Sequence, residues 1–290
     1  MKRKIFNTSN YKSILNFIRK FKLTDFNNMQ KVKQYMTFFE LKYLLRKIKE
    51  DKISNKNEKY LIQVKPNEKK PLPYEIDDLC RLHWLVLSRK AFNTLEIGSG
   101  FSTIFIADAK SILKHFFGEV NNIRCVKQFH IYSIGENKYF LNLTEKRIPK
   151  NLKKHVSLIY NKVDPIIYEG RYALRHKKLP NISPDLIYID GPSLYSTKKK
   201  INGFSFNEIC RVPMSADVLF IEFFLEPGTF IIVDGRTANS EFLKKHLKRN
   251  WIHFHDTKGD CHYFELKEKP WGIWNKKKLK FCLDSKIKFF

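Results

Sequence analysis

From Pro71 onward, the hydrophobic and polar positions of the chain alternate between two patterns. Short, nearly continuous apolar runs are typical of buried strands, and longer segments with apolar residues at steps of three and four are typical of helices. The strand-like runs are Asn93–Ile97, Phe129–Ile134, Val156–Tyr160, Asp185–Asp190 and Phe230–Asp234, followed by Trp251–His255 and Cys261–Leu266. The helix-like segments are Glu75–Leu87, which reads as amphipathic, Ser102–Phe116, Asn137–Arg147 and Ser240–Arg249. This alternation predicts a mostly parallel sheet with helices on both faces.

The last two strand-like runs, Trp251–His255 and Cys261–Leu266, are separated by a short polar connection. Two strands so close in sequence pair most simply as an antiparallel hairpin, and we expect it at the edge of the sheet. Together with the five preceding runs, the hairpin completes a seven-stranded sheet. The sequence therefore predicts an α/β fold of three layers.

Residues 1–70 differ in composition from the rest of the chain. They contain nineteen Lys and Arg against six Asp and Glu, which is half of the net charge of +26. Apolar residues at steps of three and four predict one helix from Met29 to Ile48, with an apolar face broad enough to require a packing partner. Pro71 and Pro73 then mark the entry to the next unit. We expect a basic helical extension over 1–70 and a second domain over 71–290.

The composition limits the classes of function. The chain has no continuous apolar run long enough for a transmembrane helix and no apolar stretch after its basic start, so we expect a cytoplasmic protein. Its five cysteines are dispersed, without a C-x-x-C pair, which is typical of reduced thiols rather than of disulfides or a zinc site. The positive charge comes from 43 Lys and only 12 Arg, which is a weak signature of nucleic-acid recognition.

The segment from Leu95 to Thr103 carries the strongest functional signal. A carboxylate, Glu96, ends a predicted strand, two glycines follow at Gly98 and Gly100, and hydroxyl residues begin the next helix. Glycines allow a sharp turn and close approach of a ligand, and Ser102 and Thr103 stand where helix N-caps are expected, which leaves N–H groups for a ligand. A dinucleotide fingerprint needs a third glycine where Thr103 stands, and a P-loop needs a Gly-Lys pair that is absent.

Glu96-Ile97-Gly98-Ser99-Gly100-Phe101-Ser102 resembles motif I of class I S-adenosylmethionine (SAM)-dependent methyltransferases. The resemblance covers about residues 71–268 and implies a Rossmann-like methyltransferase fold with SAM as cofactor. It assigns cofactor binding to Glu96, Gly98, Ser99, Gly100 and Ser102, with Glu96 organising the turn and facing the amino group of SAM.

The resemblance also implies an acid at the end of the second strand that binds the ribose hydroxyls. This chain departs from the pattern, because the expected position is Gly135 and the glutamate follows at Glu136. Two interpretations of Glu136 are compatible with the sequence. It binds the ribose, with Gly135 supplying flexibility, or it only begins the next helix, where a negative charge favours the helix dipole.

Asp190 and Asp234 end neighbouring predicted strands and are the candidate catalytic residues. Ligands in open α/β sheets bind at the carboxyl ends of the strands, so Asp190 is also expected beside the cofactor. The pair could hold Mg²⁺, as in catechol-type O-methyltransferases, but Gly235 stands where those enzymes have Asn, which argues against a metal. Arg236 could bind an anionic substrate or pair with Asp234. His253 and His255 share one strand face and could bind a metal, although such a pair on an edge strand is usually structural.

The leading hypothesis is a SAM-dependent methyltransferase that methylates an oxygen of a small molecule or glycan. One alternative is an RNA methyltransferase that binds RNA through the basic residues 1–70, and another is a non-catalytic binding protein, which the glycine at Gly135 favours. The sequence names neither the acceptor nor the oligomeric state, since acceptor sites in this fold are built from variable loops.

Overall fold

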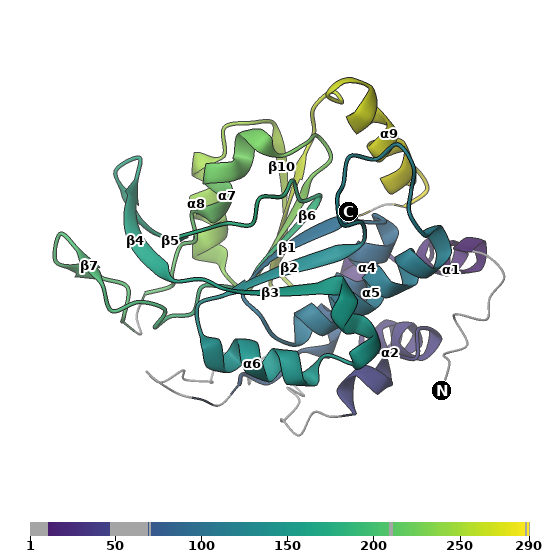
Figure 1. The fold of residues 1–290 in the computed structure, drawn as a ribbon, viewed down its shortest axis with the longest axis horizontal. Helices are drawn as coiled ribbons and strands as arrows, with labels where there is room; N and C mark the ends of the chain where they lie inside the picture. The colour runs from purple at the N-terminus through teal and green to yellow at the C-terminus, as the bar shows by residue number, and fades with distance from the viewer. Residues whose placement is uncertain (1–10, 47–68, 70, 209–210, 288, 290) are drawn as a thin grey trace.

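A computed structural model of the chain describes residues 11–46, 69, 71–208, 211–287 and 289. Its centre is a seven-stranded sheet in the order β3-β2-β1-β6-β9-β11-β10 (Figure 1). The strands are β1 Asn93–Ile97, β2 His130–Gly135, β3 Val156–Tyr160, β6 Leu186–Ile189, β9 Phe230–Asp234, β10 Trp251–Asp256 and β11 Cys261–Leu266. The first five are parallel, and β11 runs antiparallel to both β9 and β10. The predicted sheet and its terminal hairpin are confirmed.

Side chains that alternate along the strands build two cores, one on each face of the sheet. Leu186 and Tyr188 of β6 belong to the core beneath the helices α4 Ile76–Ser88 and α5 Phe101–Phe117. Ile187 and Ile189 belong to the opposite core, beneath α7 Asp217–Ile221 and α8 Thr237–His246. The helix α6 Lys138–Arg147 contacts α5, β2 and β3, and the 3₁₀ turn η4 Lys150–His155 precedes β3. The fold is therefore a three-layer α/β fold, as predicted (Figure 1).

The described part of the N-terminal extension packs on α4. It consists of α1 Tyr11–Ile18, the 3₁₀ turn η2 Leu23–Asn27, α2 Met29–Phe38 and the 3₁₀ turn η3 Leu41–Leu45. Its buried side chains join the same core as those of α4 and α5. Every residue of α4 is consequently buried, so the predicted helix is present but no face of it contacts water. The extension covers the face of α4 that would otherwise contact water.

Two helices differ from the sequence prediction by more than one residue at an end. The predicted helix Met29–Ile48 ends at Phe38, because Glu40 adopts a left-handed conformation with φ 52° that no α-helix continues through. A 3₁₀ turn then carries Leu41 and Leu44 into the core, and Ile48 lies outside the described residues. The helix predicted at Ser240–Arg249 begins and ends three residues earlier, as α8. No helix among the described residues is long and apolar enough to cross a membrane.

Two hairpins and a C-terminal helix were not predicted. β4 Val163–Tyr168 pairs with β5 Arg171–His176 after β3, and β7 Lys200–Ile201 pairs with β8 Phe204–Ser205 after β6. Both hairpins follow the carboxyl end of a parallel strand, and we call them together the hairpin lobe. It projects from one side of the sheet (Figure 1). The 3₁₀ turn η5 Glu222–Phe224 follows α7, and the Lys-rich tail forms α9 Gly272–Cys282.

Phe26 tests whether the extension is part of the core. The ring is 1% exposed and packs against Phe21, Tyr35 and Trp84. We expect Phe26→Ala to lower the free energy of unfolding by about 3–5 kcal/mol, since a large buried ring is replaced by a cavity. Urea denaturation measures the change, with Met29→Ala as control because Met29 is 43% exposed. Equal stabilities of the two variants would show that the extension does not share the core.

Candidate functional site

The carboxyl ends of β1, β2 and β6 are joined through their backbones. The Gly98 N–H donates to the Ile134 carbonyl, and the Asp190 N–H donates to the Ile97 carbonyl, both at 2.9 Å. Gly98 has φ +105°, and a Cβ there would lie 3.0 Å from the carbonyl carbon of Asp190. A Cβ on Gly191 would likewise lie 2.9 Å from the Gly98 nitrogen. Both positions require glycine, because no side chain fits between the loops.

Glu96 holds the loop after β1 against the start of α5. The side chain is fully buried, and its two oxygens accept hydrogen bonds from the hydroxyls of Ser102 and Thr103, each at 2.5 Å. Burial raises the pKa of Glu96 to about 7, although these hydroxyls and Ser133 lower it. The carboxyl group therefore links the end of β1 to the start of α5 through side-chain hydroxyls.

The prediction that Ser102 and Thr103 are N-caps was wrong. Gly100 is the N-cap residue of α5, and the two hydroxyl residues lie inside the first turn. The Gly100 N–H donates to Thr103 Oγ1 at 3.2 Å, while Gly100 itself has no atom within 4 Å of the place where a Cβ would stand. The open side of Gly100 and the first N–H groups of α5 are therefore what the loop offers to a ligand.

Gly135 and Glu136 follow β2 beside this loop. A Cβ on Gly135 would lie 3.1 Å from Leu141 and 3.2 Å from Ser99 Oγ, so a larger residue would be crowded there. The Glu136 carboxylate instead reaches the loop after β6. Its Oε1 accepts from the Ser193 N–H at 3.0 Å and from the Ser193 hydroxyl at 2.7 Å. Glu136 thus spans the end of β1, which lies between β2 and β6 in the sheet.

Arg236 binds the loop that Asp190 begins. It donates to the carbonyls of Asp190 at 2.9 Å and Pro192 at 3.1 Å, and its Nε lies 3.7 Å from Asp190 Oδ1. The Asp190 side chain is 52% exposed. Arg236 pairs with Asp190 rather than with Asp234, so this alternative from the sequence was wrong.

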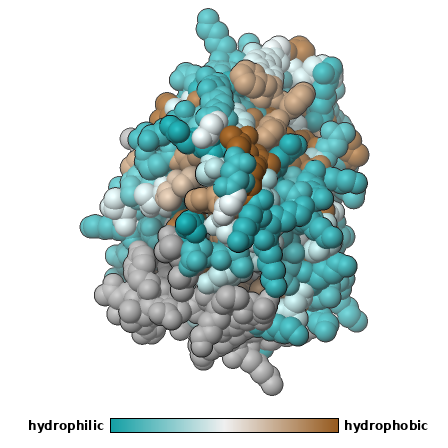
Figure 2. Space-filling view, turned by 90° about the vertical axis from the view of Figure 1, so that its left-hand side faces the viewer, coloured by the Kyte–Doolittle hydropathy of each residue, from teal (hydrophilic) through white to brown (hydrophobic). Residues whose placement is uncertain are grey.

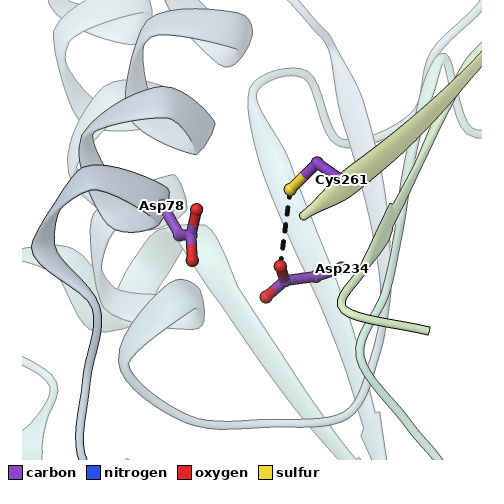
Figure 3. Close-up of side chains that lie close together, drawn as sticks. All are labelled: Asp78, Asp234 and Cys261. Carbon is purple, nitrogen blue, oxygen red and sulfur yellow. Dashed lines mark hydrogen bonds between the residues drawn. The ribbon is translucent and has the colours of Figure 1, made fainter. Parts of the chain in front are cut away.

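Asp234 belongs to a buried polar network on the α4 side of the sheet. Its Oδ2 accepts from the Tyr188 hydroxyl at 2.8 Å, and the Cys261 thiol donates to Oδ1 at 3.4 Å (Figure 3). Asp78 of α4 points toward this pair (Figure 3). Ligand atoms of Asp78, Asp234 and Cys261 lie within 4.8 Å of one another, the spacing of a metal site.

The positively charged guanidinium of Arg81 contacts two members of this cluster. Its buried guanidinium donates to the Asp78 carboxylate and, at 3.2 Å, to Cys261 Sγ. Burial, and after it the charge of Asp234, raise the pKa of Asp78, while burial keeps the Cys261 thiol protonated by raising its pKa. A protonated thiol beside an internal cation is a poor metal ligand, because the thiolate is the form that binds metal. The network stabilises the junction of α4, β9 and β11.

The histidines of the terminal hairpin bind one another. His253 Nε2 lies 3.1 Å from His262 Nδ1, and His262 Nε2 lies 3.1 Å from Thr237 Oγ1. The His255 ring stacks on His262 at 3.7 Å. Burial, together with the charges of its histidine neighbours, lowers the pKa of His262 to about 4. The three-ligand groups found among the described residues lie elsewhere and contain no histidine.

The structure thus gathers all seven predicted cofactor residues at one edge: Glu96, Gly98, Ser99, Gly100, Ser102, Glu136 and Asp190. Asp234 ends the next strand but hydrogen-bonds away from them. Sequence reasoning missed the Ser193 partner of Glu136, since nothing in the pattern links residues 57 positions apart. A separate hollow of about 490 Å³ lies between the extension and the terminal hairpin, lined by Asn27, Asn28 and His255 among others.

No protein-family profile and no curated protein matches the sequence. Solved structures with a similar fold are SAM-dependent methyltransferases. The O-methyltransferase TomG from Streptomyces achromogenes, in complex with SAM, is 16% identical over 68% of this chain and 82% of its own, with a TM-score of 0.37. The O-methyltransferase from Bacillus cereus, in complex with SAH, is 13% identical over 82% of this chain and 100% of its own, with a TM-score of 0.36.

A third similar structure is the SAH-bound methyltransferase PaMTH1 from Podospora anserina. It is 11% identical over 82% of this chain and 88% of its own, with a TM-score of 0.39. Because these TM-scores are below 0.5, the likenesses say nothing about the ligand of this chain. The strand order of the chain itself defines its fold.

Glu96 provides a test of the buried carboxyl group through pH. Its pKa is raised from 4.5 to about 7, so the native state holds this proton more tightly than the unfolded state does. Glu96 consequently loses stabilising free energy as the pH rises from 4.5 to 7, and Glu96→Gln, which does not ionise, avoids this loss. We expect the stability of the variant relative to the native chain to rise by up to about 3 kcal/mol across that interval. Urea titrations at several pH values measure it, and a difference that is flat with pH would contradict the assignment.

Proposed function

We propose that this chain is a SAM-dependent methyltransferase that transfers a methyl group to an oxygen atom of a small molecule or glycan. The cofactor would lie across the carboxyl ends of β1, β2 and β6, over the Gly98–Gly100 loop. When bound, SAM supplies an activated methyl group, and the chain supplies binding and orientation. Each part of this proposal is supported by a separate feature of the edge.

The Glu136 carboxylate is the observation that carries the proposal. One of its oxygens already accepts two hydrogen bonds, from an N–H and an O–H of Ser193. A ribose offers a similar pair of donors in its two neighbouring hydroxyls, and an ionised carboxylate accepts both. The crowding at Gly135 supports an acid displaced by one residue, because a carboxylate at that position would meet Leu141 and Ser99. Glu136 would therefore exchange Ser193 for the ribose.

The loop after β1 fits the rest of an adenosyl cofactor. Gly100 leaves space on its open side, and the N-terminus of α5 stands next to it. Both oxygens of Glu96 are bonded to α5 hydroxyls, so its role in the proposal is to fix the loop. Any contact between Glu96 and the amino group of SAM would need a further donor or water between them.

Of the two acids predicted to be catalytic, Asp190 is the better placed to meet an acceptor. It ends β6 and half of its side chain is exposed, whereas Asp234 is hydrogen-bonded by Tyr188 and Cys261. We keep Asp190 as an acceptor-side residue and assign Asp234 to the buried network. Since Asp190 and Asp234 face different partners, the proposal includes no Mg²⁺ between them.

The hairpin lobe is the region that would contact the acceptor. It follows the carboxyl ends of β3 and β6, beside the proposed cofactor site. Residues 161–178 have five Lys and Arg against two acids, and residues 196–211 have four against one. The face of the molecule that carries the lobe is mostly hydrophilic, with hydrophobic residues near its middle (Figure 2). A polar acceptor that bears hydroxyl groups, with or without negative charge, suits this surface.

Glu136→Gln tests the ribose assignment. We expect the variant to bind S-adenosylhomocysteine about tenfold to hundredfold more weakly than the native chain, because a hydrogen bond to a charged group is worth about 1.5–3 kcal/mol. Isothermal titration calorimetry measures the affinity.

Glu145→Gln is the matched control, since Glu145 lies in α6 with a largely exposed side chain. It should leave the affinity unchanged. Native affinity in Glu136→Gln would refute the ribose assignment, and absence of binding by the native chain at millimolar ligand would refute the proposed function.

A further inference from the structure

The end of β5 holds a buried histidine that the proposed function does not use. His176 is 0% exposed, and its Nδ1 lies 2.8 Å from Asp217 Oδ2. The His176 backbone N–H donates to Asp217 Oδ1, also at 2.8 Å. The Ser215 hydroxyl donates to Asp217 Oδ2 at 2.8 Å. Asp217 therefore receives three hydrogen bonds and fixes the imidazole in one orientation.

This arrangement determines which ring nitrogen is basic. An ionised carboxylate only accepts hydrogen bonds, so the Nδ1 of a neutral His176 carries the proton and Nε2 carries the lone pair. Nε2 is buried and has no hydrogen-bond partner among the described residues. Burying an acceptor without a donor is destabilising, so this nitrogen is a candidate contact for a ligand.

His176 lies next to the proposed cofactor site. It pairs with Val163 at the start of β4, directly after the end of β3. There the Asn161 N–H donates to the carbonyl of Gly135 at 3.0 Å, which ties the lobe to the end of β2. Burial alone would lower the pKa of His176, but the hydrogen bond and charge of Asp217, and then the charge of Glu136, raise it above its ordinary value. The field of Glu136 thus reaches the imidazole.

We propose that His176 is the general base that deprotonates the hydroxyl group of the acceptor, with Asp217 as its positioning residue. This inference rests on the proposed function. The O–H bond of the acceptor breaks and an Nε2–H bond forms, which leaves the electron pair on the acceptor oxygen. That oxygen takes the methyl group, and the sulfur of the cofactor keeps the electron pair of the broken C–S bond. Asp217 stabilises the imidazolium, and a neutral imidazole removes a proton near neutral pH better than an ordinary carboxylate.

The assignment also explains why the lobe is joined to α7. Asp217 begins α7, and Ser215 bridges to Leu174 of β5, so the base and its partner come from segments 41 residues apart. Because Nε2 is covered, the acceptor reaches it only when the lobe opens. We expect ligand binding at the Glu136 edge to change the surroundings of the imidazole, since Glu136 must release Ser193 to bind a ribose and its charge acts on His176.

Ring NMR tests the basic nitrogen without knowledge of the acceptor. In the chain labelled with ¹⁵N-histidine, the His176 signals are identified by their loss in His176→Asn, whose amide N–H replaces Nδ1–H toward Asp217. At pH 8 we expect a protonated Nδ1 and a bare Nε2 whose resonance shifts when S-adenosylhomocysteine is added. Asp217→Asn should abolish the tautomer preference. A proton on Nε2 at pH 8 would overturn the proposal. So would an Nε2 resonance that does not shift although calorimetry shows that S-adenosylhomocysteine is bound.

Calorimetry and methyl transfer separate the two proposals. His176→Asn and the control His155→Asn, which replaces a buried imidazole bonded to the Phe129 carbonyl, should bind S-adenosylhomocysteine like the native chain. Failure of the native chain to bind refutes the proposed function, whereas loss of binding in a folded His176→Asn alone refutes its acceptor-side role.

With tritiated SAM and a panel of catechols, phenols and acidic sugars, the kcat of His176→Asn should fall about 10²-fold or more, without change in the KM for SAM. Native kcat should rise with pH through the His176 pKa measured by NMR, and an unchanged kcat in His176→Asn would overturn the proposal.

Discussion

The contact between the loops that follow β1 and β6 is the constraint on which the rest of the edge depends. Gly98 and Gly191 face each other so closely that neither position has room for a Cβ. Hydrogen bonds from Gly98 to β2 and from Asp190 to β1 tie three strand ends into one rigid support. The open side of Gly100, the start of α5 and the reach of Glu136 are all defined relative to that support.

Carboxyl groups at this edge differ in what surrounds them, and their proposed roles follow from that difference. Glu96 is fully buried between hydroxyls and is suited to fixing a loop, whereas Glu136 is partly exposed and holds a serine that a ribose could replace. Asp234 is enclosed in a network that already contains the cation of Arg81. The polar network on the α4 side of the sheet thus contributes to stability, whereas the residues of the proposed chemistry lie at the carboxyl ends of the strands and in the hairpin lobe.

The sheet could be predicted because its central parallel strands are buried on both faces and read as apolar runs. β1, β3 and β9 have the predicted bounds at both ends. The hairpin lobe could not be predicted, because β4 contains Pro165 and β5 contains Arg171 and Arg175, so neither shows a clean apolar alternation. The helix predicted from Met29 is present but shorter than predicted, because it ends before a left-handed residue, Glu40, that is not a glycine and so gives no sign in the sequence.

The predicted cofactor residues could be placed together because strand ends of a parallel sheet meet at one edge. Their partners could not, since the bonds from Glu136 to Ser193 and from His176 to Asp217 join residues that only the tertiary structure brings together. The sequence therefore predicts which residues meet at one edge of the sheet, and it predicts Asp190 and Asp234 on the acceptor side. In the structure the two acids have different side-chain partners, and a buried histidine, His176, lies in the lobe.

A crystal structure of the chain with S-adenosylhomocysteine tests the central claim most directly. The account predicts that the ligand lies over the Gly98–Gly100 loop and that Glu136 leaves Ser193 and accepts both ribose hydroxyls, at about 2.5–3.0 Å. A ligand bound elsewhere, or one bound at this edge while Glu136 remains on Ser193, would contradict it.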